Sequence, residues 1–305
     1  MSYKDVNNIV SRPVRRAETP IQELNWLYGV SEPTWGIPMR KMSVWAAAGG
    51  VGKSRLAITL AKELTTIGIP YRGVLYPIEV LYFQNEIDVS TFKSWIGDGD
   101  KIPPNKLFVS TDCSVDEQIK TIMDVKPYIV IIDSIQMLYE FSGASDNGIK
   151  AIIDGTKEKM GYRDILKKLN CHIIFISQLT KAGDPKGSTM MTHLADQVFL
   201  LNKLDKMFPD RFVFKVGDKN RCGRVGEQFT SWWQHLDDRV ICESDFRLED
   251  EKWCKSHNIP QKKIINDDNE INDDNEINDN NEINDNNEKS FNFFRNLKLK
   301  EELFK

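Results

Sequence analysis

Residues 47–54 read Ala-Ala-Gly-Gly-Val-Gly-Lys-Ser, and the predicted architecture of the chain rests on this stretch. It fits the phosphate-binding loop pattern Gly-x-x-x-x-Gly-Lys-Ser/Thr, with Ala47 in the first Gly position. The apolar run 42–46 before it predicts a buried strand, and residues 55–67 after it have apolar side chains at helical spacing. A strand, a glycine-rich turn and a helix together aim backbone N–H groups and the positive end of a helix at a polyphosphate.

Each residue type in this loop has a chemical reason. Lys53 is expected to reach the β- and γ-phosphates, and the hydroxyl of Ser54 is expected to hold Mg²⁺. The glycines permit unusual backbone angles and a close approach to the ligand. We therefore expect ATP and Mg²⁺ as cofactors. The predicted nucleotide-binding residues are Ala48, Gly49, Gly50, Val51, Gly52, Lys53 and Ser54.

The composition is that of a globular protein with one strongly acidic segment. The chain has 305 residues, 40% of them hydrophobic, which allows one large domain or two small ones. The net charge of −4 hides a contrast, because residues 265–288 hold six Asp, four Glu and no Lys or Arg. The remainder has 35 acidic and 41 basic residues, and this net charge of +6 permits nucleic-acid binding without requiring it.

Other features predict an intracellular protein. The polar N-terminus shows no apolar signal segment, and no apolar run approaches the roughly 20 residues of a membrane span. The five cysteines are scattered without a Cys-x-x-Cys pair, which argues against a disulfide framework and a four-cysteine zinc site. We expect a soluble protein of the cytoplasm, the nucleoid or a viral replication site, with no membrane partner.

Four segments are expected along the chain. Residues 1–19 predict a flexible basic lead-in, and residues 20–260 a single α/β domain. Residues 261–290 contain a six-residue Asn/Asp repeat in four copies, with too few apolar side chains for a core, so this acidic segment is predicted to be disordered. Residues 291–305 have apolar side chains among basic ones and are a candidate amphipathic helix.

Strands and helices alternate over residues 40–201, which predicts an α/β fold whose mostly parallel sheet carries helices on both faces. Besides the strand and helix that flank the loop, the expected strands are 80–83, 107–109, 129–132 and 172–176. The expected helices are 20–28, 89–96, 115–125 and 149–169, with a small-residue loop at 143–148. Further strands at 197–201, 211–216 and 227–233 are expected to be antiparallel and at one edge.

Polar residues follow the predicted strands at the edge where such sheets bind ligands. Asp133 ends an Ile-Val-Ile-Ile run and is predicted to orient Mg²⁺ together with Ser54, the alternative being a cap after the strand. Glu86 is predicted to be the general base for the hydrolytic water, with Asp88 as its nearest rival. Gln178 is predicted to contact the γ-phosphate and to pass its presence to the loop that follows.

Two groups of cations are candidates for further roles. Lys219 and Arg221, in the stretch Lys-Asn-Arg-Cys-Gly, are too far along the chain to be needed by their own phosphate loop. In a ring they could reach the nucleotide of the next subunit, although a basic hairpin turn is the alternative. Lys181 and Lys186 suit contacts with a nucleic-acid backbone, and a solvated loop would explain them equally well.

These motifs resemble the RadA/Sms branch of the RecA superfamily. Residues 133–138, Asp-Ser-Ile-Gln-Met-Leu, are similar to that family's Asp-Ser-Ile-Gln-Thr-Leu. Residues 219–223 are similar to its Lys-Asn-Arg-Phe-Gly motif, with Cys222 in the Phe position, and the similarity covers residues 17–235. The resemblance implies a RecA-like P-loop ATPase related to DnaB-like and RepA-type ring helicases. It also implies a hexameric ring that holds single-stranded DNA and acts in recombination, repair or branch migration.

The resemblance implies roles for the matched residues as well. Lys53 and Ser54 would be the phosphate-loop pair, and Glu86 the catalytic carboxylate. Asp133 would be the Mg²⁺-orienting acid, and Lys219 and Arg221 would couple ATP to DNA.

The sequence also departs from the family's pattern. Gln178 stands where a His is expected in this branch, and the sequence shows neither the family's four-cysteine zinc module nor its Lon-protease-like domain. Two alternatives stay open: a replicative helicase core of DnaB or RepA type, and a KaiC-like regulatory module that uses ATP for assembly.

Overall fold

The computed structural model describes residues 15–19, 22–29, 36–71, 74–97, 101–136, 145–179, 190–205, 208–223, 230–236 and 239–242. The chain divides into two compact units, residues 1–263 and 264–305. The second unit lies outside the described residues, as do the acidic repeat predicted at 261–290 and the candidate helix at 291–305.

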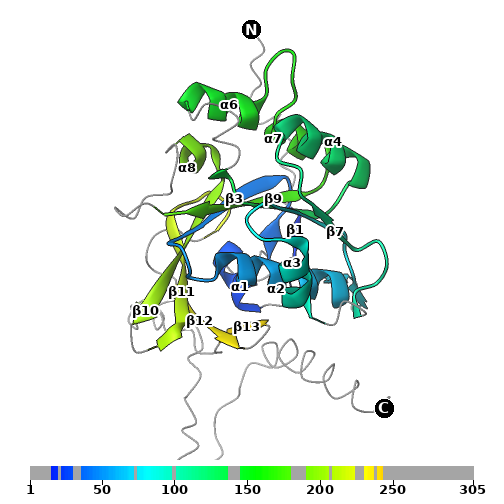
Figure 1. Ribbon diagram of the computed structural model, residues 1–305. Helices are drawn as coiled ribbons and strands as arrows, with labels where there is room; N and C mark the ends of the chain where they lie inside the picture. The colour runs from blue at the N-terminus through cyan, green and yellow to red at the C-terminus, as the bar shows by residue number, and fades with distance from the viewer. Residues whose placement is uncertain are drawn as a thin grey trace, which may run out of the picture. The chain divides into compact units, whose positions relative to one another are not determined.

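A nine-stranded sheet forms the centre of the described part, in the order β13-β12-β11-β10-β3-β9-β8-β6-β7 (Figure 1). The neighbours from β10 to β7 pair in parallel, and β11 to β13 continue the sheet in antiparallel pairs. The parallel strands are β3 (Lys41–Ala47), β6 (Val80–Gln84), β7 (Leu107–Ser110), β8 (Ile129–Asp133), β9 (His172–Gln178) and β10 (Gln197–Asp205). The others are β11 (Phe208–Asn220), β12 (Thr230–Leu236) and β13 (Arg239–Cys242). This arrangement confirms the predicted α/β class.

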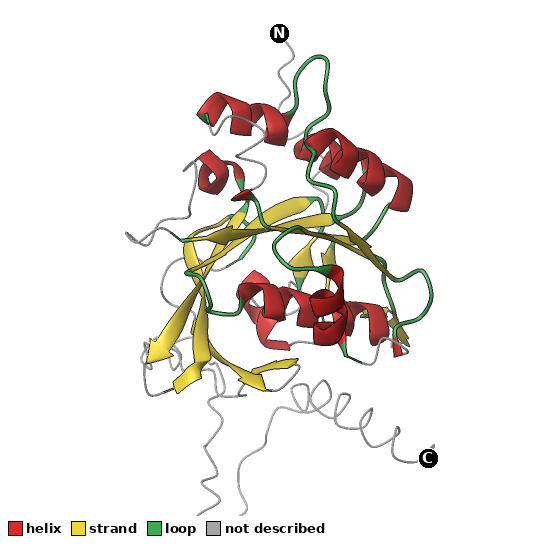
Figure 2. Ribbon diagram, in the orientation of Figure 1, coloured by secondary structure: helices red, strands yellow, loops and turns green. Residues whose placement is uncertain are grey.

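Helices cover both faces of the sheet, as predicted (Figure 2). One face carries α1 (Gln22–Tyr28), α2 (Lys53–Thr66) and α3 (Val89–Ile96). The other carries α4 (Val115–Val125), α6 (Asp146–Asp154), α7 (Tyr162–Lys168) and α8 (Met190–Leu194). Two short pairs, β1 (Arg16–Ala17) with β2 (Ile37–Pro38) and β4 (Ile69–Tyr71) with β5 (Val74–Tyr76), lie outside the main sheet.

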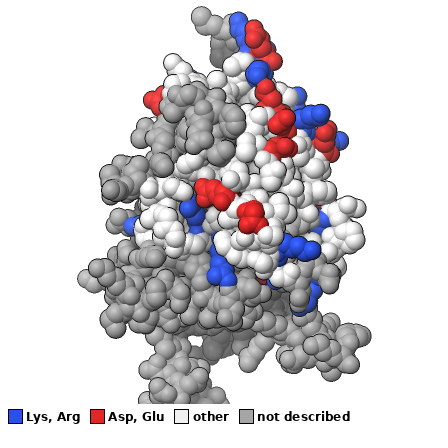
Figure 3. All heavy atoms as spheres, in the orientation of Figure 1, with Lys and Arg blue, Asp and Glu red and all other residues white. Residues whose placement is uncertain are grey.

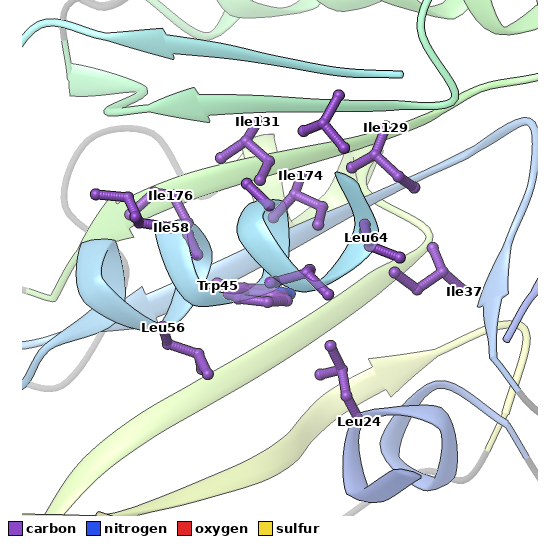
Figure 4. Packing of buried hydrophobic residues seen from close by; sticks show 14 of the residues in the cluster. Leu24, Ile37, Trp45, Leu56, Ile58, Leu64, Ile129, Ile131, Ile174 and Ile176 are labelled. Atoms are coloured by element: carbon purple, nitrogen blue, oxygen red, sulfur yellow. The ribbon is translucent and has the colours of Figure 1, made fainter. Parts of the chain in front are cut away.

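The two helical layers follow from unbroken apolar strands. In β8, Ile129 and Ile131 join the core that contains α2, whereas Val130 and Ile132 join the core that contains α4 and α7. Successive side chains of a strand point to opposite faces, so a strand that is apolar throughout needs a cover on each side. Figure 4 shows the first of these cores, where α2 packs against Trp45 and the isoleucines of β8 and β9.

The helix predicted over residues 149–169 is wrong in its middle. The chain forms α6 and α7 there, separated by residues 155–161. Gly155 has a φ of +81°, and a Cβ at this position would lie 2.8 Å from the backbone nitrogen of Gly161. The close turn therefore requires glycine and interrupts the helix.

Further boundaries differ from the prediction. Residues 146–148 belong to α6 instead of the predicted loop, because the Ser145 hydroxyl accepts a hydrogen bond from the Gly148 N–H and caps the helix. β10 pairs in parallel with β3, so the antiparallel part of the sheet begins one strand later than predicted. β11 extends to Asn220, so Lys219 lies within the strand and not after it.

A buried chain of hydrogen bonds fixes α1 on the sheet. The Trp45 indole N–H donates to the Tyr28 hydroxyl at 2.9 Å, and that hydroxyl lies 2.8 Å from Ser43 Oγ. Ser43 Oγ is 2.9 Å from Nε2 of His172, whose Nδ1 lies 2.7 Å from the Pro38 carbonyl oxygen. The polar groups are thereby paired within the core, where an unpaired group would be unfavourable.

The end of α1 is also tied to the turn that follows β11. The Arg16 guanidinium donates to the carbonyl oxygens of Tyr28 at 3.2 Å and Gly36 at 3.0 Å, and to that of Cys222. Asn220 Nδ2 donates to the Leu27 carbonyl oxygen at 3.4 Å. The last carbonyls of the helix are thus satisfied by side chains from distant parts of the chain.

Candidate functional site

The predicted phosphate loop joins β3 to α2 at the carboxyl edge of the parallel strands. Gly50 and Gly52 have φ values of +72° and +103°, in the left-handed region that other residues rarely adopt. Ala48, Gly49 and Gly50 are exposed, and a Cβ placed at Gly49 or Gly50 would meet no heavy atom within 4 Å. The loop therefore borders open space at the point where a ligand is predicted.

The last residues of the motif belong to a more enclosed region. Val51 packs into the core, and Lys53 and Ser54 form the first turn of α2. Lys53 is only 5% exposed, which is unusual for a lysine and is explained by a nearby carboxylate.

That carboxylate belongs to Asp133, the last residue of β8. Burial raises the pKa of the Asp133 carboxyl group, and the Ser54 hydroxyl, the Tyr82 hydroxyl and the Lys53 ammonium lower it. Glu86 lies close enough to raise this pKa further. The structure therefore brings Lys53, Ser54, Glu86 and Asp133 together at one edge of the sheet.

Tyr82 is a member of this cluster that the sequence analysis missed. Its buried hydroxyl donates to Oδ2 of Asp133 at 2.8 Å. Burial raises the pKa of Tyr82 well above its ordinary value, and the charges of Asp133 and Glu86 add to the effect. A buried tyrosine hydroxyl needs a hydrogen-bond partner, so a tyrosine within a predicted buried strand could have indicated a polar neighbour at this position.

Glu86 lies in a short turn between β6 and α3 that is held at both ends. The side-chain Oε1 of Gln84 accepts a hydrogen bond from the Ile87 N–H at 3.2 Å. Asp88 caps α3 by accepting from the Thr91 N–H at 2.9 Å, and its hydrogen bonds to Ser90 and Thr91 lower its pKa. Asp88 is thus engaged as a helix cap, whereas Glu86 is exposed beside the cluster.

Asn85 links this turn to the end of β8. Its backbone N–H donates to the Asp133 carbonyl oxygen at 3.1 Å, and its Oδ1 accepts from the Ser134 N–H at 2.9 Å. The Asp133–Ser134 peptide bond is cis. Neither Asn85 nor Ser134 was among the predicted site residues, because their contacts depend on which strands are neighbours.

Several buried polar atoms at this edge have no hydrogen-bond partner among the residues that the structure describes. They are Asp133 Oδ1, Ser134 Oγ, Asn85 Nδ2 and Gln136 Oε1. Buried polar atoms are normally hydrogen-bonded, so such a group marks a place for water or a ligand. Together with the open loop, the N-terminus of α2 and Lys53, these atoms fit a nucleoside triphosphate with Mg²⁺.

Gln178 lies at the same edge, between the loop and Asp133. It is the last residue of β9, the strand between β3 and β8, and it pairs with Ala47 in the β3–β9 register. The Leu179 N–H donates to the Ala47 carbonyl oxygen at 2.8 Å, which fixes the start of the loop that follows. Lys181 and Lys186 of that loop lie outside the described residues.

Lys219 and Arg221 lie near the amino ends of the parallel strands, opposite the carboxyl ends that carry the phosphate loop. Asn220 pairs with Gln197, Gln197 pairs with Ser43 near the start of β3, and the Arg221 N–H donates to the Asp196 carbonyl oxygen at 2.9 Å. The phosphate loop begins at Ala47, at the other end of β3 and about 13 Å from Ser43 at the usual rise per strand residue. The structure does not bring these two cations to the loop of their own chain.

The Lys219 side chain is held by its own chain. Its ammonium donates to the Thr192 carbonyl oxygen at 2.9 Å and to that of His193, at the end of α8. Burial lowers the pKa of Lys219, and neighbouring Arg221 lowers it further. Arg221 is exposed.

The charged side chains on the visible face do not form a region of one sign. Figure 3 shows acidic and basic side chains interspersed over this face of the described residues. Within the same residues, no helix is long and apolar enough to cross a lipid bilayer.

Known sequences resemble a large part of this chain. A family model described as an AAA domain matches residues 5–184. The DNA repair protein RadA of Listeria monocytogenes is 27% identical over 223 residues, covering 73% of this chain and 44% of the relative. RadA of Halalkalibacterium halodurans is 26% identical over 212 residues, with 70% and 42% covered, and RadA of Chlamydia trachomatis is 25% identical over 193 residues, with 63% and 39% covered. The chain thus spans less than half the length of these curated relatives.

A solved structure shares the fold. The crystal structure of a KaiC-like protein from Pyrococcus horikoshii superposes with a TM-score of 0.52 at 12% identity. The match covers 75% of this chain and 99% of that protein. At this identity the likeness is one of fold alone.

Proposed function

The chain belongs to the AAA domain family and has an ATPase core of the RadA and RecA type, and on that premise we propose that it hydrolyses ATP in a reaction stimulated by single-stranded DNA. The observation that carries the proposal is the gathering of Lys53, Ser54 and Glu86 around the buried Asp133. A cation, a hydroxyl and two carboxylates at the end of a phosphate loop are the groups that phosphoryl transfer to water requires.

In the proposed reaction each residue has one task. The N–H groups of the loop and the N-terminus of α2 bind the phosphates of ATP, and Lys53 neutralises charge at the γ-phosphate. Ser54 and Asp133 would hold Mg²⁺ and its waters, and the ion would supply further charge neutralisation. Glu86 accepts a proton from the attacking water while the water oxygen bonds to the γ-phosphorus. The bond between the γ-phosphorus and the bridging oxygen of ADP breaks at the same time, and the products are ADP and phosphate. Gln178 contacts the γ-phosphate beside the loop.

Lys219 and Arg221 complete the proposal at the level of assembly. Because they lie at the far edge of the sheet, they are proposed to serve the nucleotide of a neighbouring subunit in a homo-oligomer, with a hexameric ring as the expected form. Single-stranded DNA is the proposed partner, and recombination, repair or branch migration the proposed setting. The names of the RadA relatives and the basic 219–223 stretch support this part.

The proposal is tested by ATP turnover of the full chain with and without single-stranded DNA. We expect DNA to raise the rate several-fold, and Lys53→Ala to lower it at least about 100-fold, since it removes the cation at the phosphates. Lys62→Ala, the same substitution on a partly exposed turn of α2, is the matched control and should keep the wild-type rate.

The other outcomes separate the alternatives. A turnover rate that does not respond to DNA, together with ATP-dependent oligomers in native mass measurements, would contradict the proposal and favour a KaiC-like regulatory module. Strand separation on a forked substrate would favour a replicative helicase core.

A further inference from the structure

We infer that Asn85 is a positioning residue for the proposed hydrolysis: it fixes Glu86 relative to Asp133. The inference rests on the proposed function of both carboxylates. Asn85 contacts the end of β8 twice, through its backbone N–H to the Asp133 carbonyl oxygen at 3.1 Å and through its side-chain Oδ1 to the Ser134 N–H at 2.9 Å. We call this pair of hydrogen bonds the β6–β8 latch.

The latch lies beyond the end of the strand ladder. The last pair in the β6–β8 register is Gln84 with Asp133, so the chain after Gln84 is no longer held by the sheet itself. Glu86 directly follows Asn85, and Asp133 directly precedes Ser134, so any movement at the latch changes the separation of the two carboxylates. Catalytic groups lose activity steeply when they are displaced by as little as 1 Å.

The chemical nature of Asn85 also indicates a role in the site. Within the described part of the chain, its second amide atom, Nδ2, is buried without a hydrogen-bond partner, as are the neighbouring Ser134 Oγ and Asp133 Oδ1. A buried donor without a partner is destabilising. An apolar residue would avoid this effect. The asparagine is therefore better explained by the site than by packing.

Asp133 is held by a second, independent contact. The Tyr82 hydroxyl donates to its Oδ2 at 2.8 Å, so Tyr82 fixes the side chain of Asp133, whereas Asn85 fixes the backbone on either side of the Asp133–Ser134 bond. If both residues act by placing Asp133, removing the second residue should lower kcat less once the first has been removed.

The test is steady-state ATP hydrolysis by full-length Asn85→Ala. We expect kcat to fall about 10- to 100-fold while KM for ATP stays within about threefold, because the phosphate loop is untouched. Affinity for a fluorescent ADP analogue should likewise stay within about threefold, since the loop still binds the phosphates. Asn202→Ala, the same substitution at an exposed position of β10, is the matched control and should keep the wild-type kcat. Should Asn85→Ala fail to fold, Asn85→Ser replaces it, because its hydroxyl can still accept from the Ser134 N–H, and the expected loss is smaller.

A double-mutant cycle with Tyr82→Phe completes the test. The combined variant should lose less kcat than the product of the two single losses, because both residues act through Asp133. Three outcomes would overturn the inference while leaving the proposed function intact. They are single losses that multiply in the double variant, a kcat of Asn85→Ala within about threefold of wild type, and a raised KM at unchanged kcat. A wild-type protein without ATPase activity would overturn the proposed function, and the inference with it.

Discussion

His172 is completely buried, and its hydrogen bonds determine which ring nitrogen carries the hydrogen. The Pro38 carbonyl oxygen can only accept, so Nδ1 of His172 is the donor. Nε2 then accepts from the Ser43 hydroxyl, Ser43 accepts from Tyr28, and Tyr28 accepts from the Trp45 N–H. A second hydrogen on the imidazole would reverse the Ser43 bond and leave one donor of the chain without an acceptor.

This arrangement predicts a loss of stability at acid pH. Burial lowers the pKa of His172 from 6.5 to about 4, against smaller raising effects of the Pro38 carbonyl and Asp196. The folded state therefore binds fewer protons than the unfolded state between these values. The contribution of His172 is complete above pH 6.5 and is lost as the pH falls towards 4, roughly 3 kcal/mol in all. Denaturant unfolding at a series of pH values measures it.

The substitution His172→Gln isolates this effect. The variant should be less stable at pH 7, since it disturbs a packed core, but its stability should fall less steeply with acid than that of the wild type. His193→Gln, at an exposed position, is the control and should keep the wild-type slope. Equal slopes for His172→Gln and the wild type would mean that His172 does not carry the pH dependence.

At the residue scale, the sequence was informative where function depends on a local pattern. The loop at 47–54 and the acids after two apolar strands could be found because strand, turn and ligand-bearing residue follow one another in the chain. Tyr82 and Asn85 could not be found in this way. Their contacts with Asp133 and Ser134 exist because β6 pairs with β8, and no local pattern specifies that pairing.

At the scale of elements, the turn after β11 is held by the end of α1. Gly223 approaches the helix so closely that a Cβ would lie 2.6 Å from the Tyr28 carbonyl oxygen and 2.8 Å from Asn220 Nδ2. The first of these atoms is backbone, so it cannot rotate away. Together with the Arg16 contact to Cys222, this fixes the turn that presents Arg221.

Gly223→Ala is therefore expected to destabilise the protein by about 1–3 kcal/mol through overpacking. Denaturant unfolding checks the prediction. Gly49→Ala is the comparison for stability, because its Cβ would meet no heavy atom within 4 Å, and its free energy of unfolding should stay near that of the wild type. An unchanged stability of Gly223→Ala would show that the helix end yields to the added methyl group.

The elements found from sequence are those with strong periodicity or unbroken apolar runs. α3 and α4 match the predicted bounds of 89–96 and 115–125, and β3, β6, β7, β8 and β9 match within two residues, whereas β10 extends four residues beyond its predicted end. The predicted helix 149–169 was wrong because apolar spacing continues across the glycine-bounded turn at 155–161. β13 and α8 were missed because each is short, and short elements are set by tertiary contacts more than by their own sequence.

At the scale of the whole molecule, the positions of Lys53 and Arg221 predict complementation between inactive variants. Lys53→Ala and Arg221→Ala should each be inactive alone. Mixed in equal amounts under conditions that exchange subunits, they should restore about a quarter of the wild-type ATPase sites, since under the proposed function a site needs Lys53 from one subunit and Arg221 from the next. Turnover by the mixture, compared with each variant at the same concentration, measures the effect.

A mixture no more active than the sum of its parts would contradict action in trans, provided that both variants still form oligomers. Arg40→Ala, at another exposed arginine, replaces Arg221→Ala in the control mixture with Lys53→Ala. That mixture should show only the activity of the Arg40→Ala subunits, in proportion to their fraction.

The phosphate loop and Arg221 lie at opposite ends of the parallel strands, so under the proposed function each subunit would supply Arg221 from one surface and receive an arginine at another. Copies joined through these two surfaces would run head to tail. In an open row, one terminal nucleotide lacks its arginine, so the mean rate per subunit would climb with the length of the row. Closing the row into a circle removes that deficient end, and the rate per subunit would then stop depending on protein concentration.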